Sequence, residues 1–327
     1  MSYSFFGTCF NDHAQLFACL RTISNQTIIP KEIILVNSGD TNIEKEIINL
    51  LNSQKIKLVY IYKKLSRVKS LNLALSKSSS KYSFRFDSRS RFAQDYAEKA
   101  LDILENKTLN VSVVGGVPFV VSEVNKYESN LCAEIMKRAY LYFFPKHRNI
   151  NYEGYSSSIY LGCFSTHILK KIKFNEKEAL LSEDSLIIND FLEKGFKAYI
   201  SASIKVQYVC RSSFKNIIKL FNTYGYCRAN TILISKKLFI SKRHFLVFFL
   251  LIIFTISILN ISIFYTFFLP LTLLIFNLCS EIFTYKKGFN LFVPFYGTLC
   301  QISWILGFFW SLVSIFKNKE IKSNFIN

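Results

Sequence analysis

Several short motifs that would assign this sequence to a common class are missing from it. No two of its eight cysteines have CxxC spacing, and their scatter is typical of reduced thiols rather than of a zinc site or a disulfide framework. There is no GxGxxG and no Walker loop, which argues against NAD enzymes and P-loop NTPases. No helix-turn-helix, RNA-binding aromatic motif or zinc-finger spacing is present, so we expect no nucleic-acid partner.

Acidic residues are scarce. The chain has 22 Asp and Glu against 41 Lys and Arg, and its formal net charge is +19. A strongly positive chain suits an anionic membrane leaflet and phosphate-bearing substrates. Against this background two acidic positions stand out as candidates for chemistry: Asp87, and the adjacent pair Glu183 and Asp184.

Charge of either sign is absent from residues 245–280 and 289–316. Apolar stretches of about 18 residues or more predict transmembrane helices, and the alternative is the buried core helix of a soluble protein. We predict a transmembrane hairpin at 244–285, turning near Asn260 or Pro270. We predict a third transmembrane, re-entrant or interfacial helix at 289–316. The last two arrangements are favoured, because a crossing would place the basic tail, 317–327, outside.

Basic residues flank these apolar runs, in a juxtamembrane linker predicted at 231–243 and in the tail. Lys and Arg beside membrane segments mark the cytoplasmic side. The sequence therefore predicts a multi-pass protein of the plasma (inner) membrane. Its N-terminal domain, residues 1–230, should face the cytoplasm.

This N-terminal part alternates strand and helix patterns. Strands are predicted at 4–9, 32–36, 57–62, 82–87 and 111–114, and helices at 14–24, 43–51, 68–75 and 93–104. We expect the first apolar stretch to be a strand and not a signal peptide. Alternation at this spacing predicts a mostly parallel sheet with helices on both faces. Such a sheet binds nucleotides outside the carboxyl ends of its strands, where Asp87 is expected.

A series of short motifs follows the same order as in a known family. They are Asn37-Ser38-Gly39-Asp40, Arg85-Phe86-Asp87-Ser88-Arg89, Val113-Val114-Gly115-Gly116, Ser182-Glu183-Asp184, Tyr224-Gly225-Tyr226 and Trp304-Ile305-Leu306-Gly307. In this order the chain resembles a family 2 glycosyltransferase, in the branch that builds succinoglycan-type exopolysaccharides. The resemblance implies an α/β fold of the GT-A type, a Rossmann-like and mostly parallel nucleotide-sugar-binding domain, followed by C-terminal transmembrane helices.

The resemblance also implies a metal and a base. Asp87 matches a residue that ligates Mg²⁺ or Mn²⁺, which prefer hard oxygen ligands. The family's next metal-site acid is replaced by Arg89, which cannot ligate a metal. Either the site relies on Asp87 alone with phosphate and water, or Arg89 neutralises the diphosphate directly. Asp184 matches the general base of an inverting transfer, with Glu183 beside it. The alternative is that both acids only suit the first turn of a helix capped by Ser182.

The remaining implied contacts are with the nucleotide sugar. The residues concerned are Thr8, Asn11, Asn37, Arg67, Lys69, Gly115 and Gly116. Asn37 stands where the family has an Asp that binds uracil, and its amide either pairs with the base or only supports the turn. Arg67 or Lys69 is expected at the diphosphate or on a solvated helix face. The two glycines either let the backbone approach the donor or make a strand-end turn.

The sequence as a whole predicts a membrane-anchored inverting glycosyltransferase of the hexosyltransferase type. It would move a sugar from a nucleotide-sugar donor, expected to be a UDP-sugar, to a lipid-linked saccharide acceptor in exopolysaccharide, capsule or cell-surface glycan synthesis. Two alternatives stay open. One is a polyprenyl-phosphate glycosyltransferase, whose acceptor already carries its nucleophilic oxygen. The other is a catalytically degenerate scaffold of a polysaccharide assembly complex, because Asn37 and Arg89 depart from the family pattern.

Overall fold

A computed structural model describes residues 2–51, 55–138, 141, 149–177, 182–235, 263–285 and 289–316. The chain divides into two compact units. The first comprises Met1–Val121, Lys146–Lys177 and Glu183–Val209, and the second comprises Ser122–Pro145, Glu178–Ser182 and Cys210–Asn327. The catalytic domain predicted at 1–230 thus draws its residues from both units.

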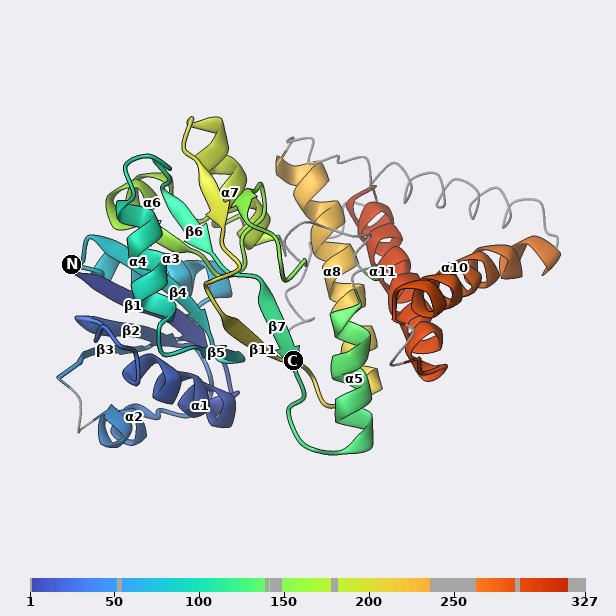
Figure 1. The fold of residues 1–327 in the computed structure, drawn as a ribbon, viewed down its shortest axis with the longest axis horizontal. Coiled ribbons are helices and arrows are strands. Elements are labelled where there is room, and N and C mark those ends of the chain that lie inside the picture. Colours follow the sequence, from blue (N-terminus) through green and yellow to red (C-terminus); the bar gives the residue numbers. More distant parts are fainter. Residues whose placement is uncertain are drawn as a thin grey trace. The chain divides into compact units, whose positions relative to one another are not determined.

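An eight-stranded sheet, ordered β3-β2-β1-β4-β9-β6-β10-β8, forms the centre of the first unit (Figure 1). Its strands are β1 (Tyr3–Cys9), β2 (Glu32–Asn37), β3 (Lys57–Tyr62), β4 (Tyr82–Asp87), β6 (Val113–Gly115), β8 (Gly154–Tyr155), β9 (Cys163–Ser165) and β10 (Ala198–Ile200). Strands β1 to β4 are parallel, whereas β9 is antiparallel to β4 and β6, and β8 to β10. The predicted α/β class with a mostly parallel sheet is therefore confirmed.

Helices cover both faces of this sheet because successive residues of a strand point to opposite sides. Phe5 of β1 belongs to one buried apolar cluster and Phe6 to the other. The first cluster includes residues of α1 (His13–Ser24), α2 (Glu44–Leu51) and α4 (Tyr96–Glu105). The second includes residues of α3 (Arg67–Lys77), α6 (Thr166–Ile172) and α7 (Glu183–Glu193). Each face of the sheet is thus buried by its own set of helices.

A second, three-stranded sheet of order β5-β11-β7 follows directly on the end of β4. It consists of β5 (Ser90–Phe92), β7 (Pro118–Val121) and β11 (Val206–Val209). The sequence predicts only a polar turn and then a helix from residue 93. Instead Phe92 and Val206, which pair across β5 and β11, are both buried in the first apolar cluster. Burial of these side chains explains why the chain is extended here before α4 begins.

The second unit is helical where the structure describes it. Its helices are α5 (Tyr127–Lys137), α8 (Phe214–Ser235), α10 (Ile263–Thr284) and α11 (Phe292–Phe316). One described segment, Phe292–Ser314, is long and apolar enough to cross a membrane, and Pro270–Thr284 is a shorter apolar helix. Helix α10 continues through Pro270, so the hairpin does not turn there. Asn260, most of the predicted linker and the basic tail lie outside the described residues.

Candidate active site

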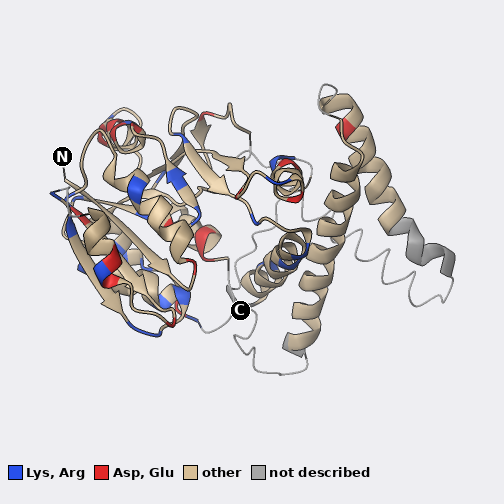
Figure 2. Cartoon of the chain, turned by 90° about the horizontal axis from the view of Figure 1, so that it is seen from below, with Lys and Arg blue, Asp and Glu red and all other residues tan. Residues whose placement is uncertain are grey.

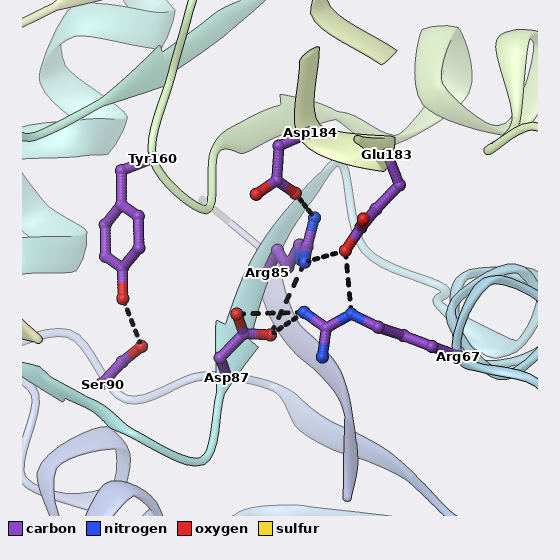
Figure 3. Close-up of polar contacts among 7 residues, drawn as sticks. All are labelled: Arg67, Arg85, Asp87, Ser90, Tyr160, Glu183 and Asp184. Atoms are coloured by element: carbon purple, nitrogen blue, oxygen red, sulfur yellow. Dashed lines mark hydrogen bonds and ion pairs between the residues drawn. The ribbon is translucent and has the colours of Figure 1, made fainter. Parts of the chain in front are cut away.

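Five charged side chains gather at the carboxyl end of β4 and the N-terminus of α7 (Figure 3). They are Arg67 from α3, Arg85 and Asp87 from β4, and Glu183 and Asp184 from α7. All five belong to the first unit. We call them the charged cluster. The sequence predicts roles for four of them, and the structure brings those four together.

Strand periodicity explains how β4 supplies two of these residues. Arg85 and Asp87 are two positions apart, so their side chains lie on the same side of the strand. Asp87 is the last residue of β4 and stands opposite Thr8 in the register with β1. The side chain of Arg85 is 1% exposed and that of Asp87 is 27% exposed. The strand thus places a buried cation beneath a carboxylate that solvent can reach.

Two guanidinium groups hold the three carboxylates. Arg85 donates from Nη1 to Asp184 Oδ1 and from Nη2 to Glu183 Oε1 at 3.2 Å. Arg67 donates from Nε to Glu183 Oε1 at 2.8 Å, and from Nη2 to both oxygens of Asp87 at 3.0 and 3.2 Å. Glu183 therefore bridges the two arginines. Through them the residue expected at the metal is linked to the residue expected to act as base.

The cluster separates the proton affinities of its carboxylates. Although burial opposes it, the charges of Arg67 and Arg85 lower the pKa values of Asp87 and Glu183 below their usual range. Burial raises the pKa of Asp184 to about 6, and the negative charges of Glu183 and Asp87 reinforce this rise despite the contact with Arg85. A carboxylate with a pKa near 6 is ionised at neutral pH and is a stronger base than an ordinary Asp.

The charged cluster offers part of the coordination shell of a divalent cation. Asp87 offers one hard carboxylate at the sheet edge, as Mg²⁺ and Mn²⁺ require. Among the described residues no group of three or more His, Cys, Asp or Glu side chains is placed to hold a metal ion. Asp87 would therefore bind a cation together with diphosphate oxygens and water. Both oxygens of Asp87 accept from Arg67 here, so Arg67 and a cation compete for them.

The loops after β1 and β2 are bonded to each other. Asn11, with a left-handed φ of 49°, accepts from the backbone nitrogen of Asp40 at 2.9 Å and donates to its Oδ2 at 2.8 Å. Asn37 is fully buried: its Oδ1 accepts from Gly39, and its Nδ2 donates to Thr41 O and to the Tyr60 hydroxyl. This geometry favours the interpretation in which Asn37 supports the turn.

Arg89, Lys69 and the two glycines have other surroundings than the charged cluster. Arg89 is paired with Asp12, with 2.9 Å between Nε and Oδ2. Lys69 is exposed and follows Arg67 by two helical positions, which turns it about 200° away around α3. A Cβ at Gly115 would contact Ile159, and one at Gly116 would overlap the carbonyl oxygen of Ile204. Packing within the chain thus accounts for both glycines, and their contact with a donor stays a prediction.

Arg85 is the functional candidate that the sequence analysis did not single out. The available signal was a charge between Phe84 and Phe86 of an apolar-patterned strand, two positions before Asp87. Figure 3 also shows the hydroxyls of Ser90 and Tyr160, 3.3 Å apart, near Asp87. Tyr160 precedes Leu161 and Gly162, which both have positive φ.

Comparisons with known proteins identify the family of the chain. The family model described as Glycosyl transferase family 2 matches residues 4–172. The dolichyl N-acetyl-alpha-D-glucosaminyl phosphate 3-beta-D-2,3-diacetamido-2,3-dideoxy-beta-D-glucuronosyltransferase of Methanococcus voltae is 26% identical over 235 residues, which are 66% of this chain and 69% of that protein.

Two solved structures are similar to the chain. One is the mannosyltransferase PcManGT from Pyrobaculum calidifontis in complex with GDP-Man and Mn²⁺, with 15% identity, a TM-score of 0.49, and coverage of 68% of this chain and 61% of that one. The other is S. aureus TarS 1-349 in complex with UDP, with 14% identity, a TM-score of 0.48, and coverage of 98% and 93%. By the family match over residues 4–172, the chain belongs to glycosyl transferase family 2 and is a glycosyltransferase.

Proposed function

We propose that this glycosyltransferase is membrane-anchored and inverting, and that it transfers one sugar from a nucleotide sugar to a lipid-linked saccharide. The observation that carries this proposal is the charged cluster. It places a carboxylate with a pKa of about 6, Asp184, beside two arginines and an Asp at the carboxyl edge of a mostly parallel sheet. Nucleotides bind at such edges.

Asp184 would act as the general base. It takes the proton from the acceptor hydroxyl as that oxygen forms a bond to the anomeric carbon of the donor. The bond from the anomeric carbon to the diphosphate oxygen breaks on the opposite face of the sugar, and the nucleoside diphosphate leaves with the electron pair. This displacement inverts the anomeric centre. Arg85 holds Asp184 in place through the contact at Nη1.

Arg67 would neutralise the departing diphosphate. Its side chain is 43% exposed, so its guanidinium can reach a ligand outside the sheet edge while Glu183 retains Nε. Asp87 would hold the divalent cation, Mg²⁺ or Mn²⁺. When bound, this cation supplies positive charge to the same diphosphate. A UDP-sugar is the donor we propose, with the carboxyl ends of β1 and β2, at Thr8 and Asn37, and the loop at Asn11 facing the nucleotide.

The proposed acceptor and location rest on other features. The relative from Methanococcus voltae is named for action on a dolichyl-linked N-acetylglucosaminyl phosphate, which supports a lipid-linked saccharide. The apolar helices α10 and α11 support attachment to a membrane. We propose a multi-pass protein of the plasma (inner) membrane, with the first unit facing the cytoplasm and a role in exopolysaccharide, capsule or other cell-surface glycan synthesis.

A donor screen tests the proposal. The purified full chain is incubated with Mg²⁺ or Mn²⁺, a panel of nucleotide sugars and extracted membrane lipids, and the lipid-linked sugars are then examined by mass spectrometry. We expect one donor to add the mass of one sugar residue to a lipid-linked saccharide. A mass increase on bare polyprenyl phosphate alone would identify the alternative transferase. The absence of both donor binding and turnover with every donor would overturn the proposal and would favour a scaffold.

A further inference from the structure

Helices α8 and α11 of the second unit lie side by side and run in the same direction (Figure 1). Ser303 Oγ donates to the carbonyl oxygen of Ile218 at 2.9 Å, and Asn222 Nδ2 donates to the carbonyl oxygen of Ser303 at 3.1 Å. Further along both helices, Ser311 Oγ donates to Asn230 Oδ1 at 2.6 Å. Residue numbers rise together along the contact, so the two helices are parallel.

Two glycines bring these helices into backbone contact. A Cβ at Gly225 would overlap the carbonyl oxygen of Trp304, and a Cβ at Gly307 would overlap the carbonyl oxygen of Asn222. Hydrogen bonds on either side of this crossing fix the register of the pair. Helix α11 therefore has one orientation relative to α8, and whatever depth α11 takes in a membrane is imposed on α8 as well.

Helix α8 carries basic residues that are unfavourable inside a bilayer. It carries three basic residues, Lys215, Lys219 and Arg228, and no acidic residue. Ser303 is the midpoint of the apolar segment Phe292–Ser314, and it bonds to Ile218, the residue before Lys219. If α11 crossed the bilayer, the exposed Lys219 would enter near the midplane. A Lys there is unfavourable, because its ammonium group would lose its hydration in the hydrocarbon.

One face of α11 is apolar and exposed. Phe292, Phe295, Leu306, Phe309 and Trp310 are exposed, and their separations of three, four, eleven and fourteen positions place them along one side of the helix. We call these five residues the apolar stripe. The glycine that contacts α8, Gly307, is buried and not part of it. No charged residue occurs in α11 (Figure 2), so this side has the composition of a membrane-inserted face.

We propose that α8 and α11 form an interfacial platform, in which α11 lies in the plane of the membrane with its apolar stripe in the boundary between lipid headgroups and acyl chains. The partner is an anionic lipid surface. Basic residues without acidic ones on α8 complement negative headgroups, and the aromatic and aliphatic stripe on α11 enters the acyl region. The proposal rests on the proposed membrane attachment and is independent of the transfer reaction.

The depth of three positions along the apolar stripe tests the platform. The full chain is reconstituted in vesicles of phosphatidylcholine and phosphatidylglycerol, and fluorescence is quenched by lipids labelled at shallow or deep acyl positions. Trp304→Phe leaves Trp310 as the reporter. In the background Trp304→Phe with Trp310→Phe, the reporter is introduced by Phe295→Trp or by Leu306→Trp. The platform predicts that shallow labels quench all three reporters at least twofold more than deep labels do.

A crossing helix gives a different profile. Leu306 lies three positions, about 4.5 Å, from the midpoint of the segment, so deep labels would quench its reporter best while the reporter at residue 295 responded to shallow ones. That gradient would overturn the platform. Quenching of no reporter by either label would also overturn it, because the stripe would then be covered by protein, such as a second copy of the chain. Neither result depends on transfer activity, so failure of the proposed reaction is a separate outcome.

Discussion

Asp184 combines two properties that an Asp on an open surface does not have together. Its pKa is raised to about 6, and Arg85 fixes its position. We expect Asp184→Asn to lower kcat for transfer by about 10²–10⁴-fold, the usual contribution of a general base. Donor affinity, measured by titration calorimetry with UDP and Mn²⁺, should stay within a few-fold because the nucleotide-facing residues are unchanged. Loss of both activity and binding would indicate a structural role instead.

The same residue sets the pH dependence of the reaction. A base must be deprotonated to accept the acceptor proton, and protonation of Asp184 becomes dominant below its pKa of about 6. The logarithm of kcat/KM, which reports the pKa of the free enzyme, should therefore fall with unit slope below about pH 6 and reach a plateau above it. The residual rate of Asp184→Asn is the control, since it should lack this inflection. An inflection that persisted in Asp184→Asn would belong to another group.

Arg85 is expected to stabilise the fold as well as position the base. Its 1% exposed guanidinium contacts Asp184 and Glu183, and Arg85→Met leaves both carboxylates without it. Breaking a buried pair costs about 3–5 kcal/mol, and we expect the low end because the Asp184 side chain, although its neighbours desolvate the carboxylate, is 47% exposed. The free energy of unfolding, measured by chemical denaturation, should fall less in Arg67→Met, since Arg67 is 43% exposed. Equal losses in both variants would contradict this account.

The residues of the site were unequally predictable. Asp87 stood out as a carboxylate at the end of a predicted strand, and Glu183 and Asp184 stood out through the resemblance to the family. Arg85 did not, because its role depends on α7 returning to β4, and that contact joins residues 99 positions apart. For Asn37 the sequence left two roles open, and the bonds of its amide to Tyr60 and to the turn favour the structural one.

The strands were also unequally predictable from the sequence. The bounds of β3 and β4 match the sequence prediction, since both are apolar-patterned runs bounded by turn residues. Strands β9 and β10 have three residues each, too few for a periodic signal, and they pair with strands distant in sequence. Such strands are extended because tertiary packing buries them, and local sequence carries little information about that.

The crossing of α8 and α11 explains the two glycine motifs of the C-terminal part. An Ala in a helix is normally about 1 kcal/mol more favourable than a Gly. Gly225→Ala should nevertheless lower the melting temperature of the detergent-solubilised protein, because its Cβ would overlap Trp304. Asn216→Ala, at an exposed position of α8, is the matched control and should not lower it. A melting temperature unchanged or raised by Gly225→Ala would show that the helices do not touch there.

The two compact units are interleaved along the chain. Helix α5 belongs to the second unit although the sequence on both sides of 122–145 belongs to the first. Its buried residues Leu131, Ile135 and Met136 lie on a helix that contacts α8 and α11, and Arg138 forms a buried ion pair with Glu281 at 2.7 Å. The helical unit is therefore assembled from segments that a cut after the last strand would separate.

This interleaving makes the outcome of a truncation predictable. A chain ending at Val209 keeps the charged cluster but deprives α5 of α8 and α11 and Arg138 of Glu281. It should aggregate, because an apolar helix face and a buried charge become exposed together. Replacing residues 122–145 of that chain with a flexible linker should restore a soluble monomer that binds UDP, since all five cluster residues come from the first unit. Size-exclusion chromatography compares the two, and a soluble, monomeric 1–209 chain that retains α5 would show that α5 does not need the C-terminal helices.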